Sequence, residues 1–96
     1  MQADGVSRLR VEIYGTEYTL RGRTSIQHLH WVAEKVDTVM HQIAAGNPSL
    51  DPKRVAVLAA INIADELRQL QEEWEEWVKL QESEEASRSS QNREGS

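Results

Sequence analysis

The chain has 96 residues, of which 39% are hydrophobic and 28% charged, and its formal net charge is −5 with no cysteine. This length allows one domain at most, and the lack of cysteine excludes disulfide bonds and cysteine-ligated metal sites. No apolar stretch reaches the roughly 18 residues that a membrane-spanning helix needs, and no signal peptide is recognisable.

Hydrophobic and polar residues alternate in two short segments near the start of the chain, which predicts two β-strands. The residues expected on the inward face of these strands are Leu9, Val11, Ile13, Tyr18 and Leu20. The Gly15-Thr16 pair between the segments suits a two-residue type II′ turn. We therefore expect a β-hairpin over residues 8–21, preceded by a disordered segment at residues 1–7.

Apolar residues recur at helical spacing over residues 25–45, which predicts an amphipathic helix that packs beneath the hairpin. Its apolar positions are Ile26, Leu29, Val32, Ala33, Val36, Val39, Met40 and Ile43. Thr24 or Ser25 can cap the first turn of this helix. Gly46, which we expect in the left-handed conformation, ends it before Pro48.

A longer helix is expected from Pro52 to about Glu82, because no glycine or proline interrupts this segment and good helix formers fill it. Asp51 stands at its N-cap position. Apolar residues recur along this helix at spacings of four and three, the pattern of a coiled-coil seam. The predicted seam, which we assign to self-association, consists of Ala56, Ala60, Ile63, Leu67, Leu70, Trp74 and Trp77.

The first half of the long helix also has a second apolar face, which consists of Val57, Leu58, Ile61 and Ala64. A helix that is apolar on two sides is expected to be buried on two sides. We therefore expect the head of the protein to cover this second face and another copy of the chain to cover the seam. The protein should then be a dimer at least.

The charges are unevenly placed along the chain. Residues 1–64 carry a net charge of +1, residues 65–85 a net charge of −7, and residues 86–96 a net charge of +1. The long helix is therefore a strongly acidic rod. This argues against nucleic-acid binding, which needs a basic face.

These patterns predict an α+β fold in which an N-terminal β-hairpin packs on a helix and a long C-terminal helix forms a coiled coil on dimerisation. The head spans residues 8–64 and includes the start of the long helix at residues 52–64. The coiled-coil helix continues over residues 65–82. Residues 83–96, with one alanine and no larger apolar residue, are expected to be disordered.

The sequence offers no catalytic or metal-binding constellation. His28, His30 and His41 do not have the i, i+4 spacing of a helical metal site, so we interpret them as surface residues. No Ser-His-Asp set, glycine-rich phosphate loop or carboxylate pair suggests an active site, and no cofactor is expected. Trp31 lies opposite the apolar face of its helix, where it can stack on Lys35 or belong to an interface.

Three parts of the chain share their residues and spacing with a known family. The hairpin stretches are Val11-Glu12-Ile13-Tyr14-Gly15 and Glu17-Tyr18-Thr19-Leu20-Arg21-Gly22. The first helix contributes Ala33-Glu34 and Val36-Asp37, and the long helix contributes Arg54-Val55-Ala56-Val57-Leu58-Ala59-Ala60-Ile61-Asn62-Ile63-Ala64-Asp65-Glu66-Leu67. Together these parts resemble the ZapA family of bacterial cell-division proteins. The resemblance covers about residues 8–70 and has the same order and spacing.

The resemblance implies a cytoplasmic, non-enzymatic protein that binds the tubulin-like protein FtsZ at midcell. Members of the family cross-link FtsZ filaments, favour their bundling into the Z-ring and lower GTPase turnover. They form homodimers through the head and the adjoining helix, and longer members pair dimers into homotetramers by antiparallel coiled coils. The present chain resembles the short form, for which we expect a homodimer, with a homotetramer as the alternative.

FtsZ resembles other acidic filament proteins, so basic residues of the head are the expected contact. The candidate partner-binding residues are Arg8, Arg10, Arg21, Arg23, Lys53 and Arg54. Exposed arginines beside Glu12 and Glu17 can also be merely solvated or paired across the strands. The alternative function is a generic coiled-coil dimerisation module for another cytoplasmic partner.

Overall fold

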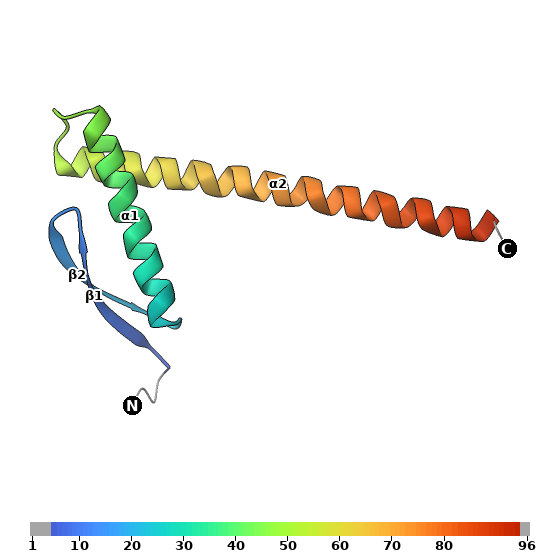
Figure 1. Ribbon diagram of the computed structural model, residues 1–96, viewed down its shortest axis with the longest axis horizontal. Coiled ribbons are helices and arrows are strands. Elements are labelled where there is room, and N and C mark those ends of the chain that lie inside the picture. The colour runs from blue at the N-terminus through green and yellow to red at the C-terminus, as the bar shows by residue number, and fades with distance from the viewer. Residues whose placement is uncertain (1–4, 95–96) are drawn as a thin grey trace. The chain divides into compact units, whose positions relative to one another are not determined.

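The computed structural model describes residues 5–94, with side chains described through residue 86. Its elements follow in the order β1 (Ser7–Ile13), β2 (Thr16–Gly22), α1 (Ile26–Gly46) and α2 (Pro52–Glu94) (Figure 1). The predicted α+β class and element order are therefore confirmed. Most of the N-terminal segment that we expected to be disordered, residues 1–4, lies outside the described residues.

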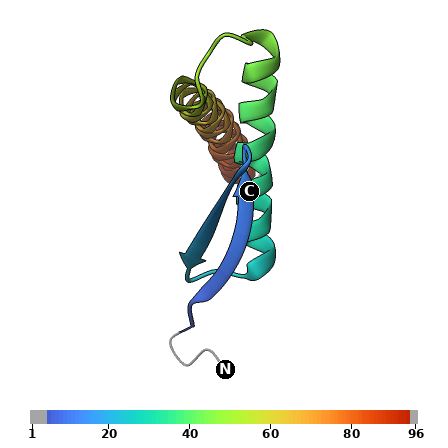
Figure 2. The same ribbon diagram turned by 90° about the vertical axis from the view of Figure 1, so that its left-hand side faces the viewer.

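The chain divides into two units between Asn62 and Ile63. The head contains the hairpin, α1 and the first turns of α2, and the second unit is the remainder of α2. In the head, the hairpin lies alongside α1, as both views show (Figures 1 and 2). The inward residues Leu9, Val11 and Ile13 of β1 are half-buried, which agrees with the predicted alternation.

The hairpin turn differs from the prediction by one residue. Ile13 pairs with Thr16, so Tyr14 and Gly15 form the turn. Their φ angles are 49° and 81°, and two positive φ values at the central positions are the signature of a type I′ turn. The predicted type II′ turn at Gly15-Thr16 was wrong because Tyr14 adopts a left-handed conformation that is usual only for glycine.

Helix α1 begins as the sequence predicts. Ser25 is the N-cap, and its hydroxyl accepts a hydrogen bond from the His28 backbone N–H at 3.0 Å. At the other end, Gly46 is the last helical residue and does not have a positive φ, so the expected left-handed cap was wrong. The backbone N–H of Asn47 closes the helix instead, with hydrogen bonds to the carbonyls of the last turn.

Helix α2 begins at the predicted cap, because the Asp51 carboxylate accepts a hydrogen bond from the Arg54 backbone N–H at 2.9 Å. The helix continues to Glu94, so the expected end near Glu82 and the expected disorder at residues 83–96 were wrong for the described part of that segment. Residues 83–94 are mainly serine, glutamate, glutamine and arginine, which a helix accepts. The first glycine after the Asp51 cap is Gly95. Low hydrophobicity alone did not end the helix.

The head has a small apolar core, contributed by both helices. Its buried residues are Leu29, Ala33, Val39, Met40, Val55 and Ala59. Val55 is completely buried, and Ala59 follows it one turn later on the same side of α2. The side of α2 that faces the core is therefore the Val55–Ala59 side, and the prediction that the head covers the Val57, Leu58 and Ile61 face was wrong, because those three residues are exposed.

Candidate interaction surfaces

The outward face of the hairpin is a ladder of charged residues. Directly opposite residues on the two strands point to the same face, so the register fixes which charges are neighbours. The outward pairs, from the open end of the hairpin to its turn, are Arg8–Arg21, Arg10–Thr19 and Glu12–Glu17. The face is thus basic at one end and acidic at the other, and each end places two like charges opposite each other.

Only one arginine of this ladder has an acidic partner among the described residues. Arg10 forms a diagonal ion pair with Glu17, and both side chains are exposed. The side chains of Arg8 and Arg21 make no ion pair or hydrogen bond with any residue that the structure describes. Arg23, just beyond the strand, is equally without a partner among those residues. The open end of the hairpin therefore presents positive charge that no described residue pairs.

The two basic residues of α2 lie elsewhere on the head. Arg54 is exposed and lies 3.8 Å from the Asp51 carboxylate, in the first turn of the helix. Lys53 borders a groove of about 430 Å³ at the turn end of the hairpin. The other residues that line this mainly apolar groove are Ile13, Tyr14, Thr16, Tyr18, Leu20, Val36, Met40, Pro52 and Ala56. The six predicted partner-binding residues therefore form two separate groups.

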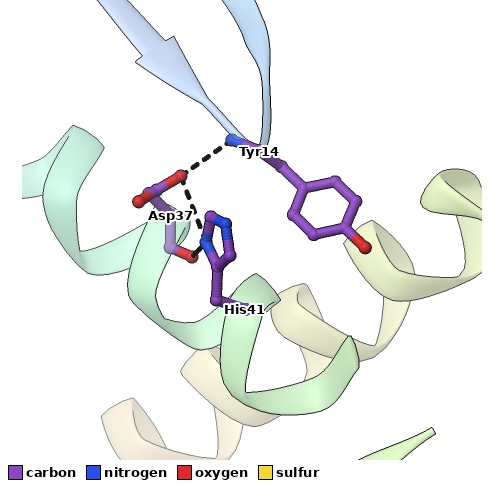
Figure 3. A network of polar contacts seen from close by, with 3 residues as sticks. All are labelled: Tyr14, Asp37 and His41. Carbon is purple, nitrogen blue, oxygen red and sulfur yellow. Dashed lines mark hydrogen bonds and ion pairs between the residues drawn. The ribbon is translucent and has the colours of Figure 1, made fainter. Parts of the chain in front are cut away.

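Sequence reasoning missed a polar network that fixes the hairpin turn on α1 (Figure 3). The Tyr14 backbone N–H donates to the Asp37 carboxylate at 2.8 Å, and His41 Nδ1 lies 2.8 Å from the Asp37 carbonyl oxygen. The rings of Tyr14 and His41 meet edge to face, with centroids 5.2 Å apart. The sequence did offer one signal for this network. Asp37 follows Val36 and therefore lies close to the apolar face of α1, where a carboxylate needs a hydrogen-bond donor.

The predicted seam is open to solvent along the second unit. Leu67, Leu70, Trp74 and Trp77 are each 51–63% exposed, although they are large apolar residues on one stripe. The indole rings of Trp74 and Trp77 stack at a centroid distance of 5.3 Å and an interplanar angle of 23°. Toward the head, Ile63 is half-buried, whereas Ala56 and Ala60 are exposed. A contiguous apolar stripe of this size is typical of an interaction surface.

Trp31 is the exposed aromatic residue of α1. Its side chain is 63% exposed and borders a shallow hollow with Glu34, Lys35 and Thr38. It therefore lies on the polar side of the helix, as the sequence predicts. The three histidines are exposed too, and His30 and His41 each lie beside a carboxylate of their own helix.

Neither a metal-binding cluster nor a membrane-spanning helix is found in the part of the chain that the structure describes. No group of three histidine or acidic side chains in that part could hold a metal ion. Over the same residues, no helix combines the length and the apolar character that crossing a bilayer requires.

The β-hairpin head and the long amphipathic helix place this protein in the class of small α+β proteins. Comparison with known proteins identifies its family. The family model "Cell division protein ZapA" matches residues 9–93. The chain belongs to the ZapA family of cell division proteins.

Individual relatives agree with this assignment. A cell division protein ZapA of Bacillus mycoides is 45% identical over 72 residues, which is 75% of this chain and 81% of the relative. That of Geobacillus thermodenitrificans is 46% identical over 68 residues, or 71% of this chain and 75% of the relative. A solved structure, a ZapA mutant dimer from Geobacillus stearothermophilus, matches with a TM-score of 0.65 and 38% identity, covering 82% of this chain and 92% of that one.

Proposed function

We propose that this protein binds FtsZ and cross-links its filaments, which promotes Z-ring assembly and lowers FtsZ GTPase turnover. It acts without catalysis of its own, in the cytoplasm at the division septum. Membership of the ZapA family supports the partner and the process. The observation that carries the cross-linking role is the exposed apolar stripe of α2, because a cross-linker needs a means of joining two binding heads.

The proposed assembly is a homodimer formed through the seam of α2. Leu67, Leu70, Trp74 and Trp77 are half or more exposed in the single chain. Burying their apolar surface against a second copy would stabilise the dimer by about 25 cal/mol for each Å² removed from water. A second copy offers the same stripe at the same 4-3 spacing, which is what knobs-into-holes packing requires. The solved relative from Geobacillus stearothermophilus is a mutant dimer, which supports self-association of this chain.

Dimerisation turns one weak binding face into a cross-linker. A symmetric dimer carries two identical heads, so each dimer can contact two filaments or two subunits of one filament. Once one head is bound, the other experiences a high local concentration of filament, and the avidity can exceed the affinity of a single head by about two orders of magnitude or more. Low affinity per head is therefore compatible with stable bundles.

Basic residues of the head are the proposed contact with FtsZ. Within the predicted set these are Arg8, Arg21 and Arg23, which make no ion pair with any described residue. Arg10 is not part of the proposed contact, because its side chain is already paired with Glu17. Exposed charges at the rim of an interface mainly set the association rate and its salt dependence. The contact should therefore weaken as ionic strength rises, with screening over about 8–10 Å at physiological salt.

Co-pelleting with polymerised FtsZ tests this function. Purified protein is mixed with FtsZ and GTP, and the amount in the high-speed pellet is compared with a sample in which GDP prevents polymerisation. We expect the protein to pellet only with polymer, and to pellet less as salt increases. Equal recovery in the two samples would instead favour a coiled-coil module that serves another partner.

A further inference from the structure

The basic end of the hairpin contains a local conflict. Arg8 and Arg21 are directly opposite each other, on the exposed face, with no acidic group among the described residues to relieve them. Like charges at opposite positions destabilise an antiparallel pair. At the acidic end of the same face, Arg10 relieves the corresponding Glu12–Glu17 conflict by its ion pair with Glu17. Local rules of this kind are broken mainly where a functional site requires it.

We propose that Arg8 and Arg21 form a carboxylate clamp that binds acidic side chains of a protein partner. This inference deepens the proposed function and rests on it for the identity of the partner, an acidic FtsZ surface. The Cβ atoms of opposite residues lie about 4.5–5.5 Å apart, so the two guanidinium groups can grip one carboxylate together or two neighbouring ones. Each guanidinium offers a planar fork that matches a carboxylate, and Arg23 extends the positive surface by two residues.

Binding at this clamp has an advantage that an ordinary surface arginine lacks. An incoming carboxylate neutralises the repulsion between the two guanidinium groups in addition to forming its own hydrogen bonds. Arg10 cannot gain in the same way, because it would have to give up Glu17 first. Only the unpaired arginines are therefore expected to bind the partner, although all of them belong to one hairpin.

The charge ladder also favours a protein partner over a nucleic acid. The Glu12–Glu17 pair lies four residues along the strand from Arg8–Arg21, or about 13 Å at the usual strand rise. A nucleic-acid duplex carries a negative charge for about every 1.7 Å of its axis, so it could not follow this face without meeting both glutamates. A protein surface can present its carboxylates at the basic end alone.

A matched pair of variants separates the clamp from general positive charge. Arg21→Gln and Arg10→Gln remove the same charge from the same face. Arg21→Gln relieves the Arg8 conflict, so it should leave the melting temperature unchanged or higher while weakening FtsZ binding about tenfold. Arg10→Gln breaks an ion pair, so it should leave the melting temperature unchanged or lower and retain FtsZ binding. Arg21→Glu should raise the melting temperature by about 2–4 °C, since it creates an opposite-charge pair with Arg8.

A second measurement does not depend on FtsZ. A short polyglutamate peptide is titrated into the wild-type protein, and the Arg side-chain Nε–H resonances are followed by heteronuclear NMR, with a DNA duplex as the competing probe. We expect the peptide to shift Arg8 and Arg21 more than Arg10. Stronger binding of the duplex, no peptide-induced shift at Arg8 and Arg21, or equal loss of FtsZ binding in the two glutamine variants would each overturn the clamp. If the wild type fails to pellet with FtsZ, the proposed function fails, and the peptide titration still decides whether the clamp exists.

Discussion

The backbone N–H of Tyr14 donates a 2.8 Å hydrogen bond to the Asp37 carboxylate, and this contact joins the hairpin turn to the middle of α1. Tyr14 has a φ of 49°, a conformation that costs a residue with a side chain about 1–2 kcal/mol. The turn therefore depends on support from outside the hairpin. His41, packed against the Tyr14 ring and beside Asp37, completes that support (Figure 3).

Replacing Asp37 with alanine should destabilise the head. The Tyr14 N–H would lose a charged acceptor in a part-buried position, which costs about 1–3 kcal/mol. Urea denaturation followed by circular dichroism measures the change. Glu34→Ala is the matched control, because it removes an acidic residue from the same helix whose exposed pair with His30 contributes little. Equal stability of the two variants would show that the turn does not need this hydrogen bond.

Two glycines at the ends of secondary-structure elements should respond differently to alanine. Gly15 has a φ of 81°, which strains any residue with a Cβ atom even where there is room for it, so Gly15→Ala should lose about 1–2 kcal/mol of stability. Gly46 has open space and no positive φ, so Gly46→Ala should leave the stability unchanged or raise it by up to about 1 kcal/mol. Thermal melts of the two variants against wild type decide this. Similar losses in both would contradict the type I′ assignment.

A charge on the seam should separate the protomers. Leu70→Glu places a carboxylate where the partner helix is expected to pack, and desolvating an unpaired charge is costly. Sedimentation equilibrium should show a dimer for the wild type at tens of micromolar and a shift toward monomer for the variant. Gln69→Glu adds the same charge one residue away, outside the 4-3 pattern, and should remain dimeric. A monomeric wild type would remove the basis for the proposed assembly.

Tryptophan fluorescence should report the same association. In a Trp31→Phe variant, emission comes only from Trp74 and Trp77, which are 62% and 51% exposed in the single chain. Burial against a partner helix should shift this emission to shorter wavelength, and dilution or a second change, Leu67→Glu, should reverse the shift. Because Trp31 is itself exposed, its replacement should alter stability by no more than about 0.5 kcal/mol. An emission maximum that is independent of concentration and of Leu67→Glu would place the two tryptophans outside the interface.

Periodicity was sufficient to predict the elements of this fold, because each has a clear pattern of period 2 or 3.6 and recognisable caps at Ser25 and Asp51. The errors came from features that local patterns do not determine. The turn is shifted onto Tyr14 because a contact with Asp37, far along the chain, supports a strained residue. The end of α2 was predicted from the loss of apolar residues after Glu82. The helix continues to Glu94 because the residues of this segment are compatible with a helix without apolar packing.

The candidate site was predictable only as a set of residues. Alternation identifies Arg8, Arg10 and Arg21 as outward-facing, but it does not give the register of the strands. The register pairs Arg8 with Arg21 and allows Arg10 to reach Glu17, and these pairings distinguish an available arginine from an occupied one. The apolar stripe on α2 could be predicted from spacing alone, since residues three and four positions apart lie on the same face of a helix.

Right-angle light scattering of FtsZ polymers tests the cross-linking function most directly. FtsZ is polymerised with GTP, and scattering is measured after adding wild-type protein or the Leu70→Glu variant, in amounts that give equal binding to polymer. We expect the wild type to raise the scattering through bundling, and the variant to bind filaments without bundling them, because it has a single head. Equal scattering from the two proteins when Leu70→Glu is monomeric, or no increase with wild type at all, would contradict the proposal that dimerisation makes this protein a filament cross-linker.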